Sequence, residues 1–73
     1  MDKLSMEYLK PIVDENVEDI IKHDHGELIE ENLDYLDMTI INMCDRLKLI
    51  SREQAAELRE TVVRELEKLK KTT

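Results

Sequence analysis

The segment 29–50, IEENLDYLDMTIINMCDRLKLI, decides the fold because its apolar residues recur at helical spacing. Steps of four and three residues alternate along it, which is the spacing of a coiled-coil seam and not the period of two expected of a strand. The seam residues are Ile29, Leu33, Leu36, Ile40, Met43 and Leu47, and Ile50 continues the spacing. The segment therefore predicts a long amphipathic helix, which we place at residues 25–48.

A second helix is predicted directly after this segment, at residues 52–70. Ser51 and Gln54 form an S-x-x-Q capping box, in which each residue can satisfy a backbone amide of the other. A stripe of apolar residues follows at helical spacing: Ala55, Leu58, Val62, Leu66 and Leu69. Because the connection between the two helices is short, we expect them to run antiparallel as a helical hairpin.

The N-terminal part of the chain predicts a shorter helix at residues 11–23. Pro11 suits the first position of a helix, where its missing N–H costs nothing. The apolar residues near this helix share one face: Leu9, Val13, Val17, Ile20 and Ile21. Residues 1–10 leave two alternatives open, namely an irregular stretch or short helix capped by Ser5, and a continuous helix kinked at Pro11.

Residues 22–27, KHDHGE, offer either a metal site or a connection between helices. His23 and His25 are two positions apart, so on a helix they would point in nearly opposite directions. Asp24 and Glu27 have the D-x-x-E spacing of a capping box, and Gly26 can link two helices. We therefore predict a helix connection here, and no metal site.

The chain is short, which favours one domain, residues 1–73, and association with another molecule. A single cysteine, Cys44, cannot form an internal disulfide, and the absence of Trp and Phe leaves an aliphatic core. Domains of this size bury little surface without a disulfide, a metal or a second subunit. We therefore expect an all-α, three-helix chain built on the hairpin and assembled as a dimeric helical bundle.

Apolar residues outside the seam widen the apolar surface of the 25–48 helix. Those that we predict to bind a partner are Leu28, Tyr35, Met38 and Ile41. Acidic residues flank them, so they form an apolar patch with a charged rim, as expected of a binding surface. The alternative is that these residues pack against the helix at 11–23.

Charge is distributed unevenly along the chain. Residues 1–37 contain twelve acidic and three basic side chains, a net charge of −9, whereas residues 38–73 contain six acidic and eight basic side chains, a net of +2. No basic face is predicted, which argues against direct nucleic-acid binding. The predicted acidic surface comprises Asp14, Glu15, Glu18, Asp19, Glu27, Glu30, Glu31, Asp34 and Asp37. It is interpreted either as a stripe that imitates phosphates or as the solvated faces of two helices.

The sequence contains no pattern that predicts an enzyme. Cys44 lies far along its helix from both histidines, and a chain with one glycine has no phosphate-binding loop. We therefore predict no catalytic, metal or cofactor-binding residues. No apolar run reaches the roughly 20 residues of a membrane span, and a single cysteine is typical of a reducing compartment, so we expect a cytoplasmic protein.

Two functional hypotheses of different class follow. The first is a non-enzymatic helical protein–protein interaction module, such as a small adaptor, chaperone-like protein or regulator, that forms a homodimer and docks through the apolar patch. The second is an acidic inhibitor of the phage type, which would occupy the cationic groove of a nucleic-acid enzyme by imitating phosphates.

Overall fold

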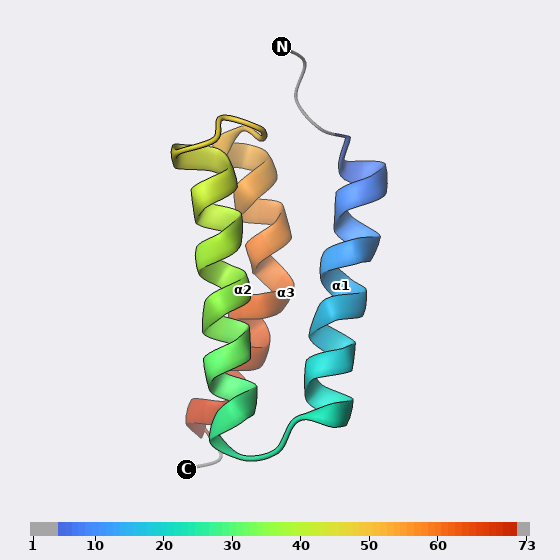
Figure 1. Cartoon of the computed structure of the whole chain (residues 1–73), viewed down its shortest axis with the longest axis vertical. Helices are drawn as coiled ribbons and strands as arrows, with labels where there is room; N and C mark the ends of the chain where they lie inside the picture. Colours follow the sequence, from blue (N-terminus) through green and yellow to red (C-terminus); the bar gives the residue numbers. More distant parts are fainter. Residues whose placement is uncertain (1–4, 72–73) are drawn as a thin grey trace.

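The computed structural model describes residues 5–71, and every regular element in that range is helical. The elements are α1 (Met6–His23), α2 (Glu27–Asp45) and α3 (Arg52–Lys71). The three helices lie side by side, and α2 runs in the opposite direction to both α1 and α3 (Figure 1). The prediction of an all-α chain with three helices is therefore confirmed.

The core draws residues from all three helices and from the connection before α3. Its buried members are Val13, Val17, Leu33, Ile40, Cys44, Ile50, Ala55, Leu58 and Val62. No polar or charged residue of the described chain is buried with them. Half-buried apolar side chains pack around this core, and they include most of the remaining seam and stripe residues: Met6, Leu9, Ile20, Ile29, Leu36, Met43, Leu66 and Leu69.

Helix α1 begins five residues before Pro11, so its predicted start at residue 11 is wrong, and of the two alternatives for the preceding residues the structure shows a continuous helix from Met6. The N–H of Glu7 donates to the hydroxyl of Ser5 at 3.2 Å, which satisfies one of the amides exposed at a helix start. Met6 and Leu9 then pack against the core. Because Pro11 has no N–H, the carbonyl of Glu7 loses its usual helical partner. The cap and the packed first turns maintain a continuous helix despite this loss.

The connection between α1 and α2 differs from its prediction. Asp24 ends α1, where its N–H donates to the carbonyl of Ile20 at 3.0 Å, and its carboxylate accepts a hydrogen bond from Asn32 at 2.6 Å. Gly26 has a φ of +56° and occupies the N-cap position of α2, without a side-chain cap. The predicted Asp24–Glu27 capping box is therefore wrong, because α2 begins at Glu27 and Asp24 lies beyond the capping position.

The connection between α2 and α3 begins earlier than predicted. Helix α2 ends at Asp45, and Lys48 has a left-handed φ of +56° that turns the chain. Leu47, predicted to continue the seam, is consequently 60% exposed, whereas Ile50 is buried.

The start of α3 matches its prediction. Ser51 N–H donates to the side-chain oxygen of Gln54 at 2.8 Å, and Gln54 N–H donates to the hydroxyl of Ser51 at 3.1 Å. These reciprocal bonds confirm the capping box.

Candidate interaction surface on α2

Three large apolar side chains of α2 point away from the core. Leu28 is 53% exposed, Tyr35 is 77% exposed and Met38 is 54% exposed, and we call these residues the α2 outer face. Leu33 and Ile40, on the other side of the same helix, are almost fully buried. The alternative that the outer-face residues pack against α1 is not what the structure shows, because α1 leaves them open to solvent.

Ile41, predicted to belong with them, lies in a different environment. It is half-buried, and it lines a shallow pocket between α2 and α3 together with Cys44, Asp45, Arg52, Ala55, Ala56 and Arg59. A step of three residues turns the helix surface by roughly 60°, so Ile41 lies nearer α3 than Met38 does. The predicted patch therefore divides into an exposed outer face and one side chain at the edge of the α2–α3 contact.

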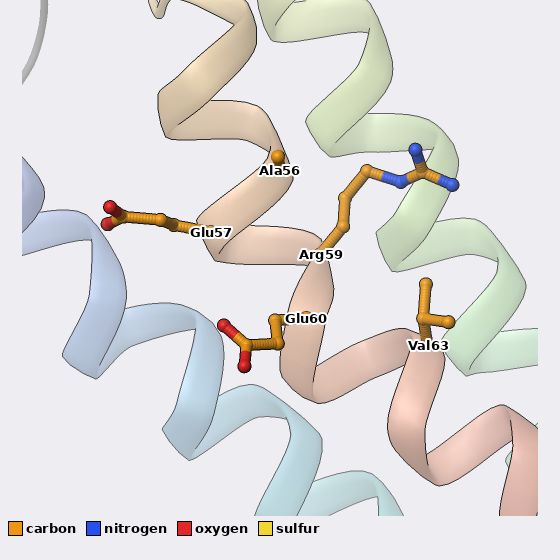
Figure 2. A pocket seen from close by; sticks show the side chains of 5 residues that line it. All are labelled: Ala56, Glu57, Arg59, Glu60 and Val63. Atoms are coloured by element: carbon orange, nitrogen blue, oxygen red, sulfur yellow. The ribbon is translucent and has the colours of Figure 1, made fainter.

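A neighbouring depression lies on α3 alone. Figure 2 shows its lining side chains, which are Ala56, Glu57, Arg59, Glu60 and Val63. All five belong to one helix, so the depression is an open surface feature and does not enclose a ligand.

A smaller cavity of about 220 Å³ lies where the three helices converge, lined by Ile21, Ile29, Leu33, Glu65, Lys68 and Leu69. The sequence did not indicate this cavity, since it forms only where three helices meet.

No group of three metal-ligating side chains occurs among residues 5–71.

Four carboxylates of the predicted acidic surface accompany the α2 outer face. Glu27, Glu30, Glu31 and Asp34 are exposed, and none of them forms an ion pair within residues 5–71. Each carries its negative charge in water, where it is available to a partner.

Asp37 does not belong to this exposed set, which corrects its assignment to the acidic surface. Its carboxylate accepts two hydrogen bonds from Arg59 of α3, at 2.6 Å and 3.1 Å. The hydrogen bond to Asp37 raises the pKa of the Arg59 guanidinium. The Asp37 side chain is only 17% exposed, so the pair joins α2 to α3 and leaves little charge for a partner.

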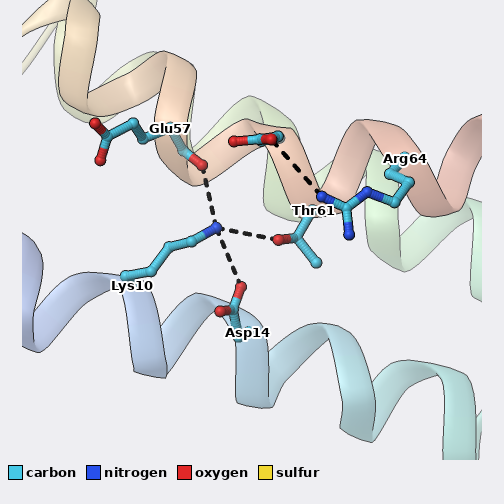
Figure 3. A network of polar contacts seen from close by, with 6 residues as sticks. Lys10, Asp14, Glu57, Thr61 and Arg64 are labelled. Carbon is cyan, nitrogen blue, oxygen red and sulfur yellow. Dashed lines mark hydrogen bonds and ion pairs between the residues drawn. The ribbon is translucent and has the colours of Figure 1, made fainter.

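The acidic residues of α1 form a separate group on another helix. Glu15, Glu18 and Asp19 are exposed. Asp14 is half-buried beside Lys10, with 3.4 Å between the charged atoms. Figure 3 shows Lys10 reaching from α1 to α3, where its ammonium donates to the carbonyl oxygen of Glu57 at 3.2 Å and to the hydroxyl of Thr61 at 3.1 Å. Asp14 thus supports a contact between helices.

Two exposed apolar residues of α1 were not among the binding residues predicted from the sequence. Tyr8 is 75% exposed and Ile12 is 53% exposed. They are four residues apart, so a helix beginning at Met6 places both on the same side. Their spacing of four residues could have been recognised in the sequence, but only if the helix was taken to continue through Pro11.

The comparisons with known proteins supply no relative from which a function could be transferred. No family model, no curated protein and no solved structure matches this chain. Among the described residues, no helix combines the length and apolar character that crossing a bilayer requires.

Proposed function

We propose that this chain is a non-enzymatic helical protein–protein interaction module, of adaptor, chaperone-like or regulatory type, that docks through the α2 outer face. The observation that carries the proposal is the exposure of Leu28, Tyr35 and Met38 on a helix whose opposite side is buried. Tyrosine and methionine are enriched at protein interfaces, and an apolar face bordered by charge is typical of them.

The outer face lies outside the core of its own chain, which supports a role in binding. The core is filled without Tyr35, which is 77% exposed. A tyrosine buries roughly 150–250 Å² when covered, and apolar area contributes about 25 cal/mol per Å². Covering the 77% of Tyr35 that is exposed would therefore contribute about 3–5 kcal/mol before the entropic costs of association.

The occupant predicted from the sequence was a second copy, in a dimeric bundle built on the α2–α3 hairpin. That assembly stays a prediction, and solution mass by light scattering over a range of concentrations tests it. A mass that rises with concentration, and that falls when Tyr35 is replaced, would support self-association through this face.

The second candidate function is an acidic inhibitor of a nucleic-acid enzyme. It is favoured by one observation, the exposed and unpaired carboxylates of Glu27, Glu30, Glu31 and Asp34. Binding of that kind would weaken steeply as salt increases, whereas docking through the apolar outer face alone would depend little on salt. Because a cationic partner would make either function salt-dependent, the sharper distinction is the Tyr35→Asp variant, which keeps all four carboxylates and should abolish only docking through the outer face.

The test of the proposed function uses the two tyrosines of the chain as a matched pair. Tyr35 and Tyr8 are similarly exposed, at 77% and 75%, but they lie on α2 and α1. We expect Tyr35→Asp to abolish partner capture, together with any self-association that uses this face. Tyr8→Asp, which makes the same chemical change on α1, should preserve binding. Circular dichroism should show the same helicity for both variants. Undiminished binding by Tyr35→Asp contradicts the proposal.

A further inference from the structure

The charge of α2 restricts what can cover its outer face. Between Glu27 and Asp45 the helix contains six acidic residues and no lysine, arginine or histidine. Arg59 neutralises one of them, Asp37. The other five are exposed. The outer face is therefore bordered only by negative charge from its own helix.

A second copy of α2 is a poor occupant of this face for electrostatic reasons. Two copies packed through their outer faces would bring together two helices that each carry five exposed carboxylates and no cation. Like charges brought together across an interface repel each other, and partial desolvation increases that repulsion. Nucleic acids and anionic membranes are disfavoured for the same reason.

We propose that the occupant of the α2 outer face is a cationic amphipathic helix of a partner protein. This inference rests on the proposed function and identifies the chemistry of its partner. Leu28 and Met38 are ten positions apart, or roughly 15 Å along the helix, which corresponds to about three turns of a partner helix. Apolar residues at helical spacing on the partner would cover Tyr35 and its neighbours. Flanking lysines or arginines would meet Glu31 and Asp34.

The experiment uses a synthetic peptide as the probe. A labelled amphipathic helix of leucine and lysine, about 14 residues long, covers the outer face. Two control peptides accompany it: one replaces every lysine by glutamate, and the other scrambles the leucine–lysine order. Fluorescence anisotropy measures affinity, and amide chemical shifts of the full chain identify the helix that is contacted.

We expect the ordered leucine–lysine peptide to bind, with its largest shifts in α2, and both control peptides to bind at least roughly tenfold more weakly. Tyr35→Ser should weaken binding about tenfold, whereas Tyr8→Ser should change it less than about twofold. The pair Glu31→Lys and Asp34→Lys should weaken binding more than the pair Glu15→Lys and Asp19→Lys, which makes the same charge change on α1.

The opposite results separate failure of this inference from failure of the proposed function. Equal binding of the glutamate peptide, or largest shifts in α1 or α3, would overturn the cationic partner. So would a dimer that depends on Tyr35 and excludes the lysine peptide, although that dimer would support docking through the outer face. If neither peptide binding nor self-association nor partner capture depends on Tyr35, both proposals are wrong.

Discussion

Replacing Leu33 by alanine tests whether one chain encloses its own core. Leu33 is 0% exposed on α2. Deleting a buried leucine side chain costs about 3–5 kcal/mol, through lost burial and the cavity that forms. A chain of 73 residues has a free energy of unfolding of roughly 4–11 kcal/mol. We therefore expect Leu33→Ala to remove a large fraction of the stability and to lower the melting temperature by at least about 12 °C.

The matched control is Leu28→Ala, which makes the same change on the same helix. Leu28 is 53% exposed, and alanine is an excellent helix former, so the free energy of unfolding should change by no more than about 0.5 kcal/mol. Urea denaturation followed by circular dichroism at several protein concentrations measures both variants. Equal losses for the two variants would refute a core enclosed by a single chain.

Three local features give further predictions, each checked by the same urea denaturation. Pro11→Ala should stabilise the protein by about 1–3 kcal/mol, because alanine restores a hydrogen bond within α1; no gain would mean that the helix begins at residue 11. Gly26→Ala should destabilise the protein by about 1 kcal/mol or more, because alanine is strained at a φ of +56°. No neighbouring atom lies within contact distance of the added Cβ, so the loss would come from the backbone alone. An unchanged denaturation midpoint would exclude that backbone conformation. Ser51→Ala should lower the free energy of unfolding by about 1 kcal/mol, because it removes the cap of α3. Ser5→Ala, which removes the more exposed cap of α1, should lower it by less.

The interaction surface was only partly predictable from the sequence. The periodicity of α2 separated Leu28, Tyr35 and Met38 from the seam, because the direction of a side chain on a helix follows from its position. Whether α1 covers these residues depends on how the helices pack. Asp37 was assigned to the acidic surface because its spacing resembles that of its neighbours. Its partner, Arg59, lies on another helix and is 22 positions away in the chain.

The sequence by itself determined the number of helices, most of their buried stripes and the start of α3; Leu47 and Ile21, which were predicted to lie in these stripes, are exposed. These depend on period and on short-range hydrogen bonds, such as those between Ser51 and Gln54, which are complete within one turn. Only the tertiary structure decided that α1 continues through Pro11, that Asp37 is neutralised and that the outer face of α2 is left in water. Each of these depends on the balance between a local cost and contacts with distant residues, and spacing along the chain does not reveal those contacts.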